Sequence, residues 1–189
     1  MSAKEPKRVR TRRRILSTAQ GLFLDPGYNE TTMAAIASAA DVSRASLFNY
    51  FPSKSALLDA MGHDLEARLL RALQHYRQKN ESEPVVLKAM FGRLAEVLAR
   101  TAPLTRCVLL QGDGQREFPK LQEALTTLAF SAQAKGIWRD DVAAKALGEM
   151  IYLALIACLL GWGGEHANGR EVTMSRAASL TALLAAPPA

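Results

Sequence analysis

Apolar residues recur along this chain at helical spacing, whereas runs that alternate between apolar and polar residues are absent. This pattern predicts an all-α protein. Near the N-terminus, apolar residues at positions i, i+1, i+4, i+7 and i+8 indicate a first amphipathic helix, built on Ile15, Leu16, Ala19, Leu22 and Phe23. The turn-forming triplet Asp25-Pro26-Gly27 ends this helix.

Hydroxyl residues mark the starts of the next helices. Thr31-Thr32 caps a second helix, whose apolar face is formed by Met33, Ile36, Ala37 and Ala40. A turn at Asp41-Val42 follows, and Ser43 is a natural N-cap for a short third helix. Pro52-Ser53 stops the third helix, and Ser53 caps a long fourth helix over about residues 54–78.

The third helix is too short to be stable alone, so tertiary packing must hold it. Leu47, Phe48 and Phe51 fall together on a helical projection, and we expect all three to anchor the helix inward. Its other sides carry Arg44, Ala45, Ser46, Asn49 and Tyr50. Asparagine pairs with adenine, arginine pairs with guanine, and small residues contact a thymine methyl group. Two short helices joined by a tight turn, with such residues on the second, describe a helix-turn-helix, although a packing unit with a solvated face has the same pattern.

The rest of the chain predicts a larger helical body. A linker is expected at residues 80–84, and the later breaks at Pro103, Gly112-Asp113-Gly114, Pro119, Gly136 and residues 161–169. The helices are expected at about 85–101, 104–111, 120–135, 141–163 and 173–185. We therefore divide the chain into an N-terminal domain, residues 1–54, and a body, residues 55–189.

Positive charge is concentrated at the N-terminus. The formal net charge is +6, and seven lysines and arginines against one glutamate precede Ile15, so the remainder of the chain is neutral overall. A basic terminus alone also fits a solubilising tail. Joined to a helix-turn-helix, it favours contact with the DNA backbone or minor groove.

Several classes of protein are disfavoured by the sequence. Cys107 and Cys158 lie far apart, and the three histidines have no ligand spacing with them, so neither a disulfide framework nor a metal site is predicted. No nucleophile–base arrangement or phosphate loop indicates an enzyme, and no cofactor is expected. The longest apolar run, residues 150–160, is shorter than the ~20 residues that span a bilayer, and no signal peptide is evident. We expect a cytoplasmic protein without a membrane segment.

Many fixed-spacing residues in about the first sixty positions closely resemble the tetracycline-repressor (TetR) family. The matching positions are Gly27-Tyr28, the run Thr31 to Ala37, the run Asp41 to Phe51, Lys54 and Leu57-Leu58. The chain departs from the family pattern at three of them, where the family often has Gly, Tyr and His in place of Ala45, Phe48 and Tyr50. Phe48 would keep a packing role without a hydroxyl group, and Tyr50 would still donate to a phosphate.

The resemblance implies roles for residues at the matching positions. Those that look like phosphate contacts are Thr32, Ser43, Tyr50 and Lys54. Those that look like the base-reading set are Arg44, Ala45, Ser46 and Asn49. Arg10, Arg12 and Arg13 are expected to follow the adjacent backbone or minor groove. Tyr28 is expected in the core.

The resemblance also implies a homodimer, formed through the last two long helices, that binds palindromic double-stranded operator DNA. The body would hold a pocket for a small-molecule effector. Candidate lining residues, each of which also suits a packed core, are Met90, Phe91, Leu94, Cys107, Leu110, Phe130, Trp138, Tyr152 and Ile156. Such a lining favours an apolar or amphipathic effector. A repressor released by that effector is the leading interpretation. The alternatives are a transcriptional activator and a basic protein that binds nucleic acid without sequence preference.

Overall fold

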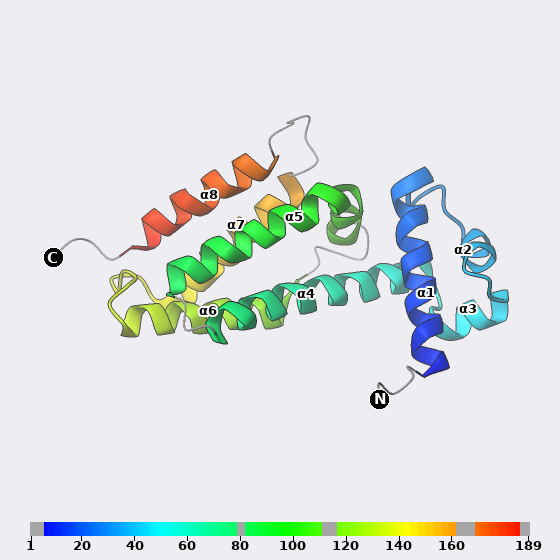
Figure 1. Cartoon of the computed structure of the whole chain (residues 1–189), viewed down its shortest axis with the longest axis horizontal. Coiled ribbons are helices and arrows are strands. Elements are labelled where there is room, and N and C mark those ends of the chain that lie inside the picture. The colour runs from blue at the N-terminus through cyan, green and yellow to red at the C-terminus, as the bar shows by residue number, and fades with distance from the viewer. Residues whose placement is uncertain (1–5, 79–81, 111–116, 162–168, 186–189) are drawn as a thin grey trace. The chain divides into compact units, whose positions relative to one another are not determined.

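A computed structural model of the chain describes residues 6–78, 82–110, 117–161 and 169–185 (Figure 1). Within these ranges the chain is helical and forms no β-strand beyond an isolated antiparallel bridge between Trp138 and Ala185. The predicted all-α class is confirmed. The elements are α1 (Lys7–Leu22), a turn η1 (Phe23–Gly27), α2 (Met33–Ala39), α3 (Arg44–Tyr50), α4 (Lys54–Gln78), α5 (Glu83–Leu110), α6 (Pro119–Ala134), α7 (Ala144–Gly161) and α8 (Gly169–Leu184).

The helices form two compact units. The first runs to Asp64 and includes the end of α5 from Arg106, and the second comprises Leu65–Thr105 and the chain from Glu117. Compact packing thus divides the chain within α4 and α5. The functional boundary at residue 54 stays a prediction.

The basic N-terminal segment is helical, which the apolar pattern did not indicate. α1 begins at Lys7, eight residues before Ile15, the first buried residue of the helix. Lysine and arginine are good helix formers. The segment was missed because its side chains from Lys7 to Arg10 are all exposed and leave no apolar stripe.

The prediction of a break at Pro103 was wrong, because α5 continues from Glu83 to Leu110. A proline inside a helix removes one hydrogen bond and costs about 3 kcal/mol. Apolar side chains that are buried along α5, before and after Pro103 in the sequence, offset this cost. The buried residues are Val86, Leu87, Met90, Phe91 and Leu94 before it, and Leu104, Val108 and Leu109 after it. The predicted turn at residues 112–114 lies outside the described residues.

Helices α6 and α7 approach each other closely. A Cβ atom added at Gly148 of α7 would lie 2.6 Å from the Thr126 Oγ1 atom of α6 and 2.7 Å from its Cα. No side-chain rotation relieves a contact with a backbone atom. Gly148 is therefore required by the packing of this helix pair.

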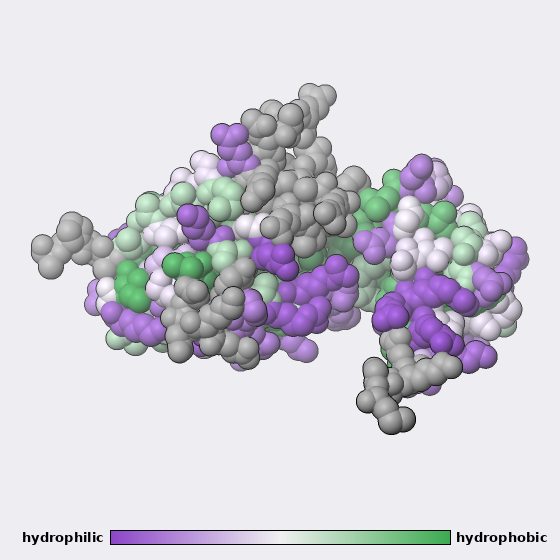
Figure 2. Space-filling model, in the orientation of Figure 1, coloured by the Kyte–Doolittle hydropathy of each residue, from purple (hydrophilic) through white to green (hydrophobic). Residues whose placement is uncertain are grey.

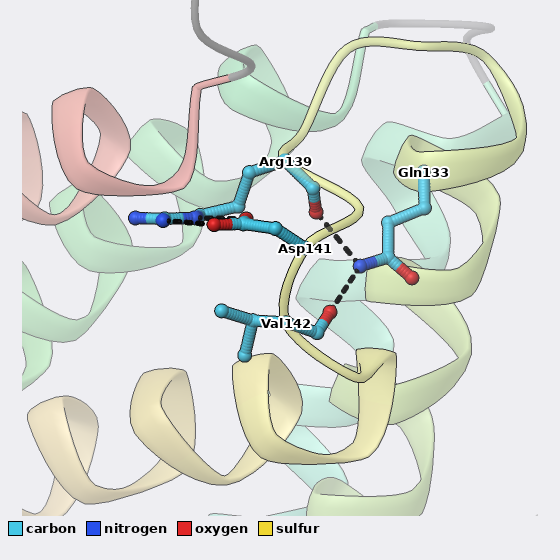
Figure 3. A network of polar contacts seen from close by, with 4 residues as sticks. All are labelled: Gln133, Arg139, Asp141 and Val142. Atoms are coloured by element: carbon cyan, nitrogen blue, oxygen red, sulfur yellow. Dashed lines mark hydrogen bonds and ion pairs between the residues drawn. The ribbon is translucent and has the colours of Figure 1, made fainter.

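A polar network orders the loop between α6 and α7 (Figure 3). The Gln133 side-chain amide donates to the carbonyls of Arg139, at 2.8 Å, and Val142, at 2.7 Å, while the Arg139 guanidinium pairs with Asp141. α6 itself ends at Ala134, and Gly136 just beyond it has a positive φ of 66° that allows the Gly136 and Ile137 N–H groups to cap the helix. Because these contacts hold residues 139–142 in a loop, α7 begins at Ala144 and not at the predicted residue 141.

The start of α6 receives its cap from α4. Glu66 is buried, and its Oε1 atom accepts hydrogen bonds from the N–H groups of Lys120, at 3.0 Å, and Leu121, at 3.1 Å. The Tyr152 hydroxyl on α7 accepts another from the Phe118 N–H at 3.1 Å. Three N–H groups at this helix start are thus satisfied by side chains distant in sequence.

A second buried acid, Glu83, opens α5. Its carboxylate accepts hydrogen bonds from the Ser131 hydroxyl, at 2.8 Å, and the Lys135 ammonium, at 2.5 Å. Burial opposes ionisation of Glu83, but these donors outweigh it and hold its pKa below the usual value. The ion pair joins the start of α5 to the end of α6.

Candidate nucleic-acid interface

The first three helices share one apolar core. Ile15 and Ala19 of α1, Ile36 of α2 and Leu47 of α3 are fully buried, and Phe51 is 3% exposed. The inward anchoring of Leu47 and Phe51 is confirmed. The prediction for Phe48 was wrong, because its side chain is 49% exposed.

Phe48 points away from the core because α3 ends at Tyr50. Phe51 adopts an extended backbone, φ −144° and ψ 109°, that turns its ring back into the core. Leu47 within the helix and Phe51 just beyond it then fill the core. Phe48 lies about 100° around the helix from Leu47 and remains at the surface.

The predicted caps of α2 and α3 are present. The Thr32 Oγ1 atom accepts a hydrogen bond from the Ala35 N–H at 3.1 Å, and the Ser43 Oγ atom accepts one from the Ser46 N–H at 3.1 Å. Ser53 caps α4 in the same way, accepting from the Ala56 N–H at 3.1 Å. Each cap lies three residues before the donor, so the starts of these helices are determined locally.

A tight turn joins α2 to α3. Asp41 has a left-handed φ of 49°, which aspartate tolerates better than most residues. The Val42 N–H donates to the Ala37 carbonyl at 3.0 Å, and the Arg14 guanidinium of α1 donates to the Asp41 carbonyl at 3.1 Å. These contacts hold the two short helices at a defined angle, as in a helix-turn-helix.

The outer face of α3 presents the predicted base-reading residues. Arg44, Ala45 and Asn49 are exposed, and Ser46 is half-buried. The Ser43 hydroxyl donates to the Ser46 Oγ atom at 2.9 Å. Since this bond uses a lone pair of Ser46, the Ser46 hydroxyl keeps its own hydrogen for an acceptor such as a purine N7.

The basic residues of α1 lie beside this face. Arg10, Arg12 and Arg13 are exposed, and Figure 2 shows hydrophilic surface over the start of α1. The Arg12 guanidinium lies 5.0 Å from the centroid of the Phe51 ring, which is a cation–π contact. Arg12 and Arg14 therefore brace α3 and its turn, in addition to contributing positive charge.

Lys54, a predicted phosphate contact, is directed toward the turn before α2. Its ammonium donates to the Tyr28 carbonyl at 2.7 Å and the Asn29 carbonyl at 3.4 Å, and lies 4.5 Å from the centroid of the Tyr28 ring. Tyr28 is half-buried, with its ring edge against Phe23. Burial raises the pKa of Tyr28, and the nearby Cys107 and Asp59 raise it further.

The candidate effector-pocket residues fall in both compact units. Met90, Phe91, Leu94 and Trp138 are at most 1% exposed and belong to the packed core of the second unit. Tyr152 and Ile156 are half-buried there. The other candidates differ: Cys107 and Leu110 fall in the first unit, and Leu110 and Phe130 are 56% and 60% exposed. The effector pocket therefore stays a prediction.

Cys107 has the properties of a structural thiol. Burial raises its pKa, and the positive charge of Lys54 only partly opposes this effect. The thiol is therefore protonated near neutral pH and is a poor nucleophile.

Glu66 was missed in the sequence, although two signals indicate it. It lies on the buried face of α4 with Leu58, Leu69 and Leu73, and an acid in an apolar stripe requires a partner. In addition, α6 begins at Pro119 without a capping side chain of its own.

Among the described residues, no helix is long and apolar enough to cross a membrane. The same part of the chain holds no cluster of three or more His, Cys, Asp or Glu side chains suited to a metal ion.

The three-helix core, the turn between α2 and α3 and the outward face of α3 define a helix-turn-helix DNA-binding protein. Residues 15–61 match the family model described as "Bacterial regulatory proteins, tetR family". The HTH-type transcriptional repressor KstR of Mycobacterium tuberculosis is 26% identical over 168 residues, which cover 86% of this chain and 75% of that protein.

Solved structures share the fold over almost the whole chain. FadR of Thermus thermophilus, a TetR-family transcriptional repressor in complex with lauroyl-CoA, aligns with a TM-score of 0.69 and 26% identity, covering 94% of this chain and 97% of that one. FadR of Bacillus subtilis, in complex with stearoyl-CoA, aligns with a TM-score of 0.76 and 13% identity over 91% of this chain and 98% of that one. Residues 15–61 are therefore a TetR-family DNA-binding domain, and the chain as a whole is similar to TetR-family transcriptional regulators.

Proposed function

We propose that this protein is a transcriptional repressor that binds a palindromic operator as a homodimer and leaves the DNA when it binds an amphipathic effector. The outward face of α3 is the observation that carries the proposal, since its exposed Arg44 and Asn49 and the donor hydroxyl of Ser46 suit base edges in a major groove.

Residues around α3 would hold the helix on the DNA backbone. Thr32, Ser43 and Tyr50 would contact phosphates, with Arg10, Arg12 and Arg13 along the adjacent backbone or minor groove. Thr32 and Ser43 would do so from the cap positions that they already occupy, and both are exposed. Lys54 differs from this group, because its ammonium already binds the Tyr28 and Asn29 carbonyls.

The surface of α7 supports the homodimer. Met150 and Leu153 are 44% and 63% exposed at i, i+3 spacing, and Leu183 on the contacting helix α8 is 61% exposed. A second copy of the same pair of helices would cover these side chains. Leu153→Glu should give a monomer in sedimentation velocity, while Lys145→Glu, an exposed control on the same helix, should leave a dimer.

The effector would be a compound with a long apolar part and a polar head. The pocket candidates of the second unit are mostly apolar, and the similar FadR protein of Thermus thermophilus binds lauroyl-CoA. Acyl-CoA thioesters and free fatty acids of increasing chain length are the first compounds to test for release of the protein from DNA.

Selection from a random pool of duplex DNA tests the proposal. A repressor of this kind enriches a two-fold symmetric sequence. Asn49→Ala should weaken binding to that sequence by about 1–3 kcal/mol and leave binding to random DNA nearly unchanged. Equal losses on both duplexes would count against base reading by α3. Loss of the protein should also raise transcription from a promoter that carries the selected sequence, whereas an activator would show the reverse.

A further inference from the structure

Phe48 is a large apolar side chain that α3 leaves in solvent. It is 49% exposed, while its neighbour Leu47 is fully buried and Phe51 is 3% exposed. A single apolar residue at a protein surface is ordinary. Its position is informative here, because it lies on the seven-residue helix whose other exposed residues include Ala45 and Asn49.

Helix geometry places the Phe48 ring near Ala45. The two residues are three positions apart and are neighbours on the helix surface. Helical side chains lean toward the helix N-terminus, so the ring covers the turn that contains Ala45. The N-terminal part of a recognition helix is the part that contacts base edges. Ala45 is exposed and has only a methyl group, which leaves space for the ring on this side of α3.

The chemistry of phenylalanine restricts what this side of α3, with Phe48 and Ala45, recognises. The ring has no hydrogen-bond donor or acceptor, so it pairs neither with a phosphate nor with the polar groups of a base. The apolar group that a base presents in the major groove is the C5 methyl of thymine, and alanine and phenylalanine are side chains that contact it.

We propose that Phe48, together with Ala45, packs against a thymine methyl group in each half-site and thereby selects thymine at one operator position. This inference rests on the proposed function, because it requires α3 to lie in the major groove.

Deoxyuridine substitution tests the contact at the level of one methyl group. Uracil lacks only the C5 methyl of thymine, so every hydrogen bond of the base pair is kept. In the duplex that the wild-type protein selects from a random pool, each thymine is replaced by deoxyuridine in turn, at the same position of both half-sites. At one position, uracil in place of thymine should weaken binding by about fourfold per half-site, because the protein no longer buries one methyl group there.

Substitution of Phe48 identifies the side chain responsible. Phe48→Ala should lower the affinity ratio between thymine and uracil at that position to about one. Phe48→Leu keeps an apolar side chain and should retain most of the ratio. Leu24→Ala is the matched control, since Leu24 is an exposed apolar residue of the same unit but lies in η1 and not in α3. It should keep the full wild-type ratio.

The outcomes separate this inference from the proposed function. Wild-type binding that tolerates uracil at every position, or a Phe48→Ala protein that keeps the wild-type ratio, would overturn the role of Phe48 and leave operator binding intact. A random pool that yields no preferred sequence would overturn both.

Discussion

The two compact units supply the N-terminal caps of their helices in different ways. In the first unit, Thr32, Ser43 and Ser53 each accept a hydrogen bond from an N–H group three residues later. In the second unit, α6 depends on Glu66, which precedes the Lys120 and Leu121 N–H groups by 54 and 55 residues. Helices α2, α3 and α4 thus begin by local contacts, whereas α6 begins by a tertiary one.

This difference relates to what each unit does. Local caps set where α2 and α3 begin, and the apolar core of the first unit holds α3 in place through Leu47 and Phe51, so the face of α3 is formed before DNA binds. The start of α6 has a defined environment only while α4, α6 and α7 are packed together through Glu66 and Tyr152. Substitutions in the second unit should therefore cost more stability than matched substitutions in the first.

The largest effect is expected at the contact between α6 and α7. Gly148→Ala should destabilise the protein by about 3 kcal/mol, because the new Cβ would lie 2.7 Å from the Thr126 Cα. Gly21→Ala on α1 is the matched control. Apart from the backbone of α1 itself and the adjacent residues, no atom lies within 4 Å of a Cβ there, so this change should stabilise the protein by up to about 1 kcal/mol through helix propensity. Urea denaturation measures both, and equal effects at the two sites would contradict the close approach of α6 and α7.

Removal of the distant cap should have the next largest effect. Glu66→Ala leaves the Lys120 and Leu121 N–H groups without their acceptor, and the loss should be about 2 kcal/mol. Glu66→Gln keeps an oxygen at the position of Oε1 and should lose less than half of that. If Gln were as damaging as Ala, the charge of Glu66 and not its geometry would be the stabilising feature.

The local cap of α4 should matter less. Ser53→Ala removes the acceptor of the Ala56 N–H and should cost about 1 kcal/mol, and Ser53→Gly only a few tenths. Thermal unfolding of Ser53→Ala and Glu66→Ala proteins under the same conditions compares the local and the distant cap directly. A greater loss at Ser53 would reverse the contrast between the two units.

The same contrast explains which features were predictable from the sequence. The starts of α2 and α3 followed from Thr32 and Ser43, and the bounds of α4, Lys54–Gln78, agree with the prediction. Local chemistry determines these features. Glu66 was missed because its partners are far away in sequence. Phe48 was misplaced because helical periodicity was extended to Phe51, whose backbone is not helical. The break at Pro103 was wrong because burial along α5 outweighs the local preference of proline.

The smallest expected effect concerns Lys54, whose contacts within the first unit are long-range in sequence. Its ammonium has three donors, and the Tyr28 carbonyl, the Asn29 carbonyl and the Tyr28 ring already surround it. A lysine that neutralises a phosphate contributes about 0.9 to the slope of log K against log salt concentration. Lys54→Met removes the contacts that hold the turn before α2. It should therefore weaken DNA binding but leave that slope nearly unchanged. Arg10→Met, which removes an exposed cation of α1, should reduce the slope. Equal reductions in the two variants would assign Lys54 to the phosphate backbone, and a long-range contact within the first unit would then be broken each time the protein binds DNA.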